Sequence, residues 1–153
     1  MEAITYKSTT VNNVTAINVV NTDEYLLALR PGNSGSASIE EGGWLSINLD
    51  QGFGFQNKAI YEFDNIFYIK NKASSNIAVT WEVNERLQLL INSGALKIYH
   101  SSHCSHWQEW HSGSVLMINT TRERGVKFVF DTQHNYQSLN NYKGEFIINA
   151  VPK

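Results

Sequence analysis

Residues 61–71 read Tyr-Glu-Phe-Asp-Asn-Ile-Phe-Tyr-Ile-Lys-Asn, and the rest of the chain is interpreted around them. Apolar side chains recur in this stretch, with aromatic residues at Phe63 and Phe67 and polar residues between them. A small turn-forming cluster follows at residues 72–75, and residues 76–83 then alternate apolar with smaller or polar side chains. Alternation with a period of two in β-branched and aromatic residues predicts strands with one buried face. The short polar loop between the two runs predicts that they pair as a β-hairpin.

Short extended runs continue along the rest of the chain, separated by glycine and asparagine turns. They cover residues 3–11, 14–20, 36–40, 44–50, 95–99, 107–110, 115–119, 125–131 and 144–151. Short strands at intervals of about 8–14 residues, with little helix between them, are typical of sandwiches and jelly rolls. The sequence therefore predicts an all-β fold, a jelly-roll-like antiparallel β-sandwich.

Two segments fit more than one structure. Residues 25–29 form a compact apolar block that ends at a Pro-Gly turn, and they fit either a strand or a short helical turn opened by Thr22 or Asp23. Residues 84–92 have apolar side chains spaced for a short helix that closes on Gly94, with a strand as the alternative.

Length and charge exclude several classes of protein. A chain of 153 residues forms one domain around one core. Its 12 basic and 14 acidic residues give no electrostatic case for a nucleic-acid or anionic-membrane surface. No run of about 18 apolar residues is present to span a bilayer. We therefore expect neither nucleic acid nor membrane among the partners.

The cysteine count and the first residues bear on the cellular location. Cys104 is the single cysteine, so the chain cannot form an intrachain disulfide. The first residues lack the basic start and apolar block of a signal peptide. The protein is then either cytosolic or a mature form given without its leader.

A cluster of histidines is the main candidate for metal chemistry. Four of the five histidines and the single cysteine lie between His100 and His111, with His103, Cys104 and His106 inside that interval. Imidazole and thiolate groups at such spacings can close a zinc or copper site. A surface loop rich in Ser and His is the favoured interpretation, because a polar loop does not by itself bring the ligands to one side. We therefore expect no metal and no other cofactor.

No catalytic motif is present. The chain contains no His-Glu-x-x-His, no Gly-x-Ser-x-Gly and no recognisable carboxylate pair. Asp50, Asp64 and Asp131 would bind calcium if they met at one loop end, but scattered aspartates usually cap turns. The sequence predicts a protein that is not an enzyme.

Aromatic residues and asparagines suggest sites for sugars. Alternation places Trp81 in the core and favours Trp107 and Trp110 as an exposed pair on which a sugar would stack. Asn13 and Asn119 each begin an Asn-x-Thr triplet, the acceptor pattern for glycosylation if the protein is secreted.

Four stretches, taken in chain order, resemble a known family. They are residues 26–29, 45–49, 63–71 and 144–150. The third, Phe-Asp-Asn-Ile-Phe-Tyr-Ile-Lys-Asn, resembles the Phe-Asp-Asp-x-Phe strand of a family of uncharacterised archaeal surface-protein domains. That family is similar to the TasA/camelysin group of biofilm-matrix fibre proteins and to archaeal bundling pili. The resemblance extends over residues 3–151.

The resemblance implies a secreted structural subunit that polymerises into an extracellular filament by donor-strand complementation. Residues 1–11 would then be an N-terminal strand extension, and residues 12–153 a single β-sandwich domain. The extension would complete the sheet of the next copy of the chain, with Ala3, Ile4 and Tyr6 filling its pockets. The donor-strand residues are Ala3, Ile4, Thr5, Tyr6 and Lys7. An open sheet edge invites such a strand, and a head-to-tail contact propagates as a homopolymer.

Two other hypotheses come from different functional classes. The first is a monomeric cell-surface module that binds carbohydrate or mediates adhesion through exposed aromatic residues. The second is a metal-dependent hydrolase that uses the loop from His100 to His111.

Overall fold

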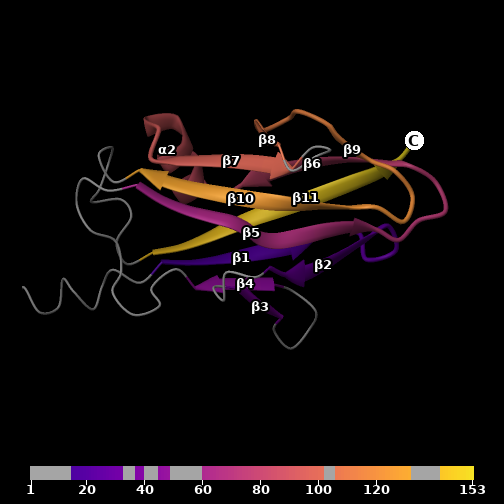
Figure 1. Ribbon diagram of the computed structural model, residues 1–153. Helices are drawn as coiled ribbons and strands as arrows, with labels where there is room; N and C mark the ends of the chain where they lie inside the picture. Colours follow the sequence, from indigo (N-terminus) through magenta and orange to yellow (C-terminus); the bar gives the residue numbers. More distant parts are fainter. Residues whose placement is uncertain (1–14, 33–36, 40–44, 49–59, 102–105, 132–141) are drawn as a thin grey trace, which may run out of the picture.

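The computed structural model describes residues 15–32, 37–39, 45–48, 60–101, 106–131 and 142–153. These residues form two β-sheets packed face to face, with one short helix at one end (Figure 1). The strands are β1 (Thr15–Asn21), β2 (Leu27–Pro31), β3 (Ala37–Ile39), β4 (Leu45–Asn48), β5 (Ile60–Asn71), β6 (Ile77–Val83), β7 (Leu96–Ser101), β8 (Trp107–Glu109), β9 (Leu116–Ile118), β10 (Glu123–Asp131) and β11 (Tyr142–Pro152). The predicted all-β sandwich is confirmed. The N-terminal extension, residues 1–11, lies outside the described residues.

The larger sheet has six strands in the order β3-β4-β1-β11-β6-β9, and the smaller sheet has five in the order β2-β5-β10-β7-β8. Every described strand pair is antiparallel except β1 and β11, which run parallel at the middle of the larger sheet. These two strands come from opposite ends of the chain. No tight turn joins them, so an antiparallel direction is not imposed on the pair.

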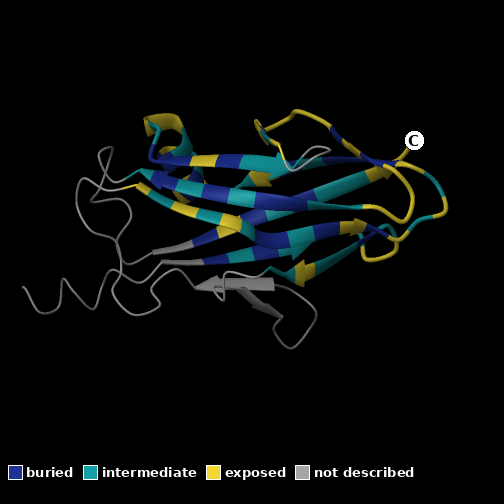
Figure 2. Ribbon diagram, viewed as in Figure 1, coloured by how far each residue is buried: buried dark blue, intermediate teal, exposed yellow. Residues whose placement is uncertain are grey.

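The predicted hairpin between residues 61–71 and 76–83 is wrong. β5 pairs with β2 and β10 in the smaller sheet, whereas β6 pairs with β11 and β9 in the larger one. The loop between them therefore crosses from one sheet to the other. Alternating burial reports that each strand has one face against the core, and two strands that face each other across a sandwich satisfy that pattern as well as two neighbours do. The blue and teal alternation along the strands follows this arrangement (Figure 2).

The connection after β6 is the short helix that the spacing favoured, α2 (Glu85–Ser93). The Asn84 side chain caps its first turn by accepting a hydrogen bond from the amide of Leu87, at 3.3 Å. Gly94 ends the helix with φ 86°, in the left-handed region where glycine is strongly favoured. Leu87 is buried over β11, where a Cβ on Gly144 would meet its Cγ at 2.7 Å. The absence of a side chain at Gly144 lets the helix pack closely on the sheet.

Residues 25–29 combine both of the structures considered for them. The Asp23 carboxylate accepts hydrogen bonds from the amides of Tyr25 and Leu26, at 3.1 and 3.2 Å, which makes a tight turn. The chain then enters β2 at Leu27. The other expected hairpin is present in part, since β3 and β4 form an antiparallel pair, and the residues between them lie outside the described part.

β5 carries a bulge opposite β10. The register shifts between Val126 and Phe128, and Asn65 has φ 50°, in the left-handed region. An asparagine tolerates this conformation better than most residues do. The Asn65 side chain then lies where a Cβ on Gly125 would stand, and its main-chain carbonyl lies where a Cβ on Gly32 would stand. Both glycines are thus required by close backbone approach.

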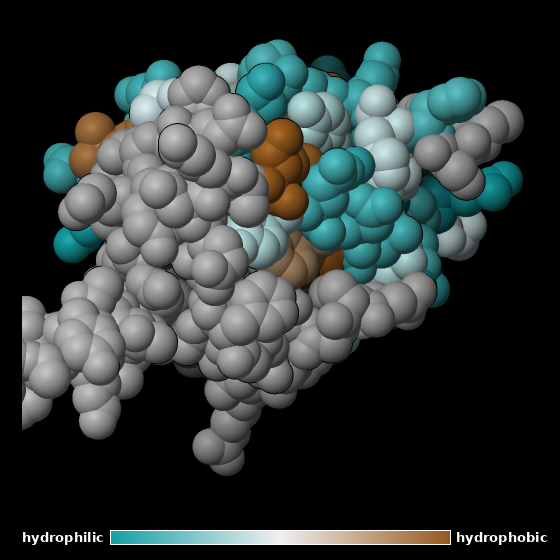
Figure 3. Space-filling model, turned by 60° about the vertical axis from the view of Figure 1, so that its left-hand side comes forward, coloured by the Kyte–Doolittle hydropathy of each residue, from teal (hydrophilic) through white to brown (hydrophobic). Residues whose placement is uncertain are grey.

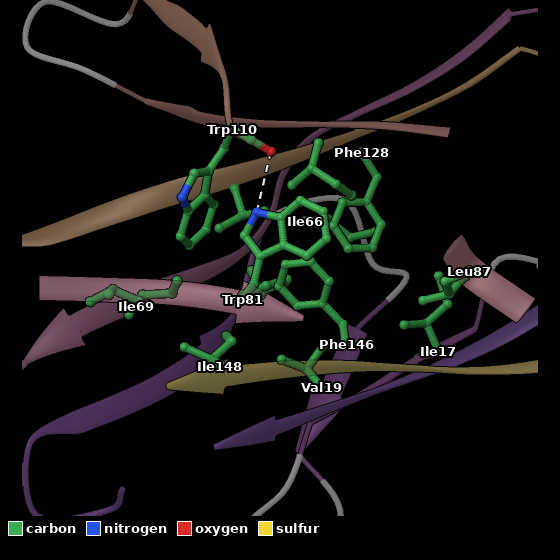
Figure 4. Close-up of a cluster of buried hydrophobic side chains, with 14 of the residues drawn as sticks. Ile17, Val19, Ile66, Ile69, Trp81, Leu87, Trp110, Phe128, Phe146 and Ile148 are labelled. Carbon is green, nitrogen blue, oxygen red and sulfur yellow. Dashed lines mark hydrogen bonds between the residues drawn. The ribbon is translucent and has the colours of Figure 1, made fainter. Parts of the chain in front are cut away.

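Aromatic side chains fill the centre of the sandwich (Figure 4). Trp81 stacks on Phe146 at 5.2 Å between ring centroids and meets Trp110 edge-on at 6.4 Å. The Trp81 indole nitrogen donates a hydrogen bond to the main-chain carbonyl of Trp110, at 3.2 Å. Trp110 is only 1% exposed, so its assignment to an exposed pair is wrong, while the core position of Trp81 is confirmed. Trp110 follows the three residues of β8 and turns inward between the two sheets.

Candidate functional site

The predicted donor strand, Ala3, Ile4, Thr5, Tyr6 and Lys7, lies outside the described residues, as does Asn13. Asn119 is exposed just after β9, where its main-chain carbonyl accepts a hydrogen bond from the amide of Arg122, at 3.0 Å. The Asn119 side chain is therefore accessible for glycosylation, as the acceptor pattern requires.

The histidine cluster is only partly described, because His103 and Cys104 lie outside the described residues. His100 packs edge-on against Trp110, with 5.9 Å between ring centroids, and its Nδ1 lies 3.3 Å from the carbonyl oxygen of Ser101. Burial lowers the pKa of His100 below 6.5, against the hydrogen bond to Ser101, which raises it. His106 is exposed. Within the described part of the chain, no three His, Cys, Asp or Glu residues come together as a metal site.

The three aspartates considered for calcium do not form a described cluster either. Asp50 lies outside the described residues. Asp64 is paired with Lys127, whose Nζ lies 3.2 Å from its carboxylate. Asp131 ends β10, where its amide donates a hydrogen bond to the carbonyl of Ala95, at 2.8 Å.

One edge of β5 is covered along only part of its length. β2 pairs with β5 from Phe67 to Asn71, and the amide of Gly32 adds a hydrogen bond of 3.0 Å to the carbonyl of Ile66. On that side, no described strand pairs with residues 60–65. Tyr61 and Phe63 in this segment are half-buried and pack against the core, and Phe63 meets Phe130 edge-on at 6.1 Å.

The outer face of the five-stranded sheet carries a cluster around Lys127. Its Nζ lies 2.7 Å from Glu62 and 3.2 Å from Asp64. The same ammonium lies 5.7 Å from the ring centroid of Tyr99 and 5.6 Å from that of Trp107. Burial by itself lowers the pKa of Lys127, but hydrogen bonds to the two carboxylates outweigh it and the pKa is raised. Lys127 is thus a charged lysine, only 13% exposed, held between acidic and aromatic side chains.

A second charged pair lies further along the same face. Arg30 makes a two-pronged contact with Glu123, at 2.6 and 3.2 Å, and its guanidinium lies 3.9 Å from the ring centroid of Tyr68. The hydrogen bond from Arg30 lowers the pKa of the Glu123 carboxyl. Because Arg30 is more than half exposed, water screens this pair, and its contribution to stability is small.

Two hollows lie at the described surface. One of about 230 Å³ adjoins the Lys127 cluster on the outer face and is lined by Ile60, Gly94, Lys97, Tyr99, Val129 and Asp131. The other, of about 210 Å³, lies between α2 and the residues after β8, with Trp81 and Trp110 in its wall. Figure 3 shows the apolar surface of the described residues as small brown areas among teal ones in that view.

The sequence pattern missed the outer-face cluster. Alternation along β10 does put Lys127 on the side opposite Phe128 and Phe130. Its partners, however, come from β5, β7 and β8, and only the strand order and register bring them together. A lysine between inward-facing aromatics, with two acidic residues spaced two apart elsewhere in the chain, was the signal available.

Comparisons with known proteins add little. No family model matches the chain, and no curated protein matches it. Among solved structures it is similar to the ASH/PapD-like domain of human CEP192 (PapD-like domain 7), with 6% sequence identity over 84% of this chain and 85% of that one, at a TM-score of 0.33. Similarity at this level carries no argument about function. Among the described residues, no helix is long and apolar enough to cross a membrane.

Proposed function

We propose that the chain is a secreted structural subunit that polymerises into an extracellular filament, a pilus or a biofilm-matrix fibre, by donor-strand complementation. The observation that carries the proposal is the edge of β5 at residues 60–65, which no described strand covers on the β2 side. Such an edge presents main-chain donors and acceptors that another strand satisfies. The proposed role is structural and not enzymatic.

The side chains beside this edge suit an incoming strand with apolar residues on one side. Tyr61 and Phe63 are half-buried, so a strand laid along the edge would remove more of their surface from water. Ile4 and Tyr6 alternate with Thr5 in the proposed donor strand. One side of the donor would therefore face the aromatic pair, and the other side would face solvent.

The partner in this proposal is another copy of the same chain. The donor segment and the β5 edge are different surfaces, so each copy offers one and receives the other, and the contact propagates head to tail. Strand addition also offsets the lack of disulfides, which a single cysteine imposes on an extracellular protein. The archaeal, TasA-like identity and the glycosylation of Asn13 and Asn119 belong to the same proposal and rest on the resemblance.

The experiment compares assembly of matched variants by negative-stain microscopy and sedimentation. We expect Ile4→Asp and Tyr6→Asp to abolish filaments, because a charge would have to enter an apolar groove. Thr5→Asp, on the opposite side of the same strand, is the matched control and should still assemble. Deletion of residues 2–11 should leave a soluble subunit that cannot elongate. Filaments of unchanged form from the deletion variant would overturn the proposal.

Hydrogen exchange then tests the receiving edge directly. Amides of residues 60–65 that point away from β10 should exchange rapidly in the truncated subunit and slowly in the filament. A synthetic peptide with the sequence of residues 2–11 should protect the same amides in the truncated subunit without causing elongation. Protection confined to a different strand would place the acceptor elsewhere and remove the observation on which the proposal rests.

A second candidate function is a monomeric module that binds carbohydrate through exposed aromatic residues. Trp110 is buried and leaves this hypothesis, whereas Trp107 keeps its place on the outer face together with Tyr99. The two functions differ in the state of the intact chain. A homogeneous monomer by analytical ultracentrifugation would favour the module, and filaments would favour the structural subunit.

A further inference from the structure

The hollow beside the Lys127 cluster has a defined chemistry. Val129 and Ile60 supply apolar surface, and Ile60 is 54% exposed, while Tyr99 supplies an aromatic ring. Lys97 and Asp131 add one positive and one negative side chain. Polar groups of both kinds beside apolar surface fix the orientation of a ligand that is itself part apolar and part polar.

The charge around the hollow argues against a charged ligand. Lys97 and Asp131 offset each other within it. Next to it, Lys127 is already neutralised by Glu62 and Asp64. No excess positive charge remains to hold an anion such as a phosphate or an acidic glycan. A lipid chain is also disfavoured, because it would remove water from the charged side chains without offering them hydrogen bonds.

The aromatic rings give the site its direction. Tyr99 is part of the hollow and also contacts the Lys127 ammonium, and Trp107 contacts the same ammonium. The cation thus holds two rings near each other on one face of a paired sheet. Glu62 and Asp64 are 56% and 58% exposed, so their oxygens remain accessible to hydrogen-bond donors from solvent or from a ligand.

From these features we infer that the outer face of the five-stranded sheet binds neutral pyranose units of a glycan chain. A pyranose has C–H faces that pack on aromatic rings and a rim of hydroxyls that both donate and accept hydrogen bonds without carrying charge. The hollow is smaller than the roughly 300–1,000 Å³ pockets of drug-sized ligands, so it takes one ring, and Trp107 receives the neighbouring unit. The site lies on a sheet face rather than at a strand edge, so it does not depend on filament formation.

The test uses the full-length chain and defined oligosaccharides. Neutral tetrasaccharides of glucose, mannose and N-acetylglucosamine, an anionic tetragalacturonate and a tetralysine peptide are titrated by calorimetry and by saturation-transfer NMR. We expect at least one neutral probe to bind with a dissociation constant on the order of 0.1–1 mM, as suits a shallow site. Tetragalacturonate and tetralysine should bind more weakly than that probe.

Variants locate the binding. Tyr99→Ala and Trp107→Ala should each weaken it by roughly tenfold, as expected for loss of one stacking surface. Val129→Arg should block the hollow while leaving both rings in place. Tyr25→Ala removes an aromatic side chain that is 91% exposed elsewhere and should change nothing. Circular dichroism confirms that each variant is folded.

Three results would overturn the inference. They are no binding by any neutral probe at about 10 mM, ten times the weakest affinity expected, unchanged binding in the folded Tyr99→Ala and Val129→Arg variants, or a preference for tetragalacturonate or tetralysine. None of these readouts depends on whether the chain forms filaments, so the two proposals stand or fall separately.

Discussion

The buried side-chain amide of Asn71 donates a hydrogen bond of 2.9 Å to the main-chain carbonyl of Ile118, and so joins the end of β5 to β9 in the opposite sheet. The same amide donates to the carbonyl of Ser75, at 2.9 Å, and its oxygen accepts from the amide of Ala73, at 2.7 Å. Asn71 is the one polar residue among the described positions that is fully buried. Its hydrogen bonds fix the loop that carries the chain from one sheet to the other.

Replacement of this asparagine should be strongly destabilising. Asn71→Leu leaves two buried carbonyls and one amide without their partner, and we expect a loss of about 2–4 kcal/mol in the free energy of unfolding. Asn71→Asp keeps the acceptor for Ala73 but loses both donors, and should cost at least as much. Urea unfolding followed by tryptophan fluorescence measures the change.

The matched control is Asn92→Leu, in which an exposed asparagine on α2 is replaced. Its side chain accepts a hydrogen bond only from Gln88 on the same helix, at 2.9 Å. We expect a change within about 0.5 kcal/mol. A loss at Asn71 no larger than at Asn92 would contradict the proposed role of the crossing loop.

The two tryptophans around β8 should differ in their effect on stability. Trp110→Ala removes a side chain packed against Trp81, His100 and Phe146, with an expected cost of about 3–5 kcal/mol. Trp107→Ala removes a side chain on the outer face and should cost less than about 1.5 kcal/mol. Thermal unfolding of both variants in parallel measures the difference, and equal losses would argue against the burial of Trp110.

The close approach of Asn65 to Gly125 predicts a coupled pair of substitutions. Gly125→Ala places a Cβ where the Asn65 side chain lies, and should cost about 1–3 kcal/mol. Asn65→Gly removes that side chain and suits the positive φ of this position. In a double-mutant cycle, the double variant should recover about 0.5–2 kcal/mol relative to the sum of the single losses. Strict additivity would show that the two residues do not meet.

His100 should make stability depend on pH in a defined window. Its pKa in the folded protein is below 6.5, so the unfolded chain binds more protons near that pH. Stability should be complete above about pH 7 and should fall as the pH drops from 6.5 towards the lowered pKa. Urea midpoints measured between about pH 7.5 and pH 5 test this.

The control for that measurement removes the titrating group. His100→Gln should flatten the pH dependence over this interval, whereas His111→Gln, at an exposed position, should leave it as in the parent chain. A slope that survives in His100→Gln would assign the effect to other groups.

Much of the fold could be predicted because it depends on neighbours in the sequence. The helix of α2 is set by apolar spacing and by its caps, Asn84 and Gly94, and Asp23 sets the turn before β2. The hairpin between β5 and β6 was mispredicted because alternation reports one buried face without reporting which strand lies alongside. Trp110 was misplaced for a related reason, since β8 ends before it and its inward direction depends on the opposite sheet.

The candidate sites were less predictable. The open edge of β5 exists because β2 stops at Pro31, opposite Phe67, which is a matter of register. The hollow on the outer face needs Tyr99, Lys97 and Val129 to lie side by side, and they come from strands about 30 residues apart in the chain. Neither feature leaves a local pattern.

The sequence by itself determined that the chain is an all-β sandwich with a short capped helix, because periodicity, turn residues and caps act over a few residues. Only the tertiary structure decided which strands are neighbours, that β1 and β11 lie parallel at the centre of one sheet, and that Lys127 meets Glu62, Asp64, Tyr99 and Trp107 on the other. The physical reason is that hydrophobic burial fixes which face of a strand turns inward, whereas strand order and register follow from how the whole set of faces packs together.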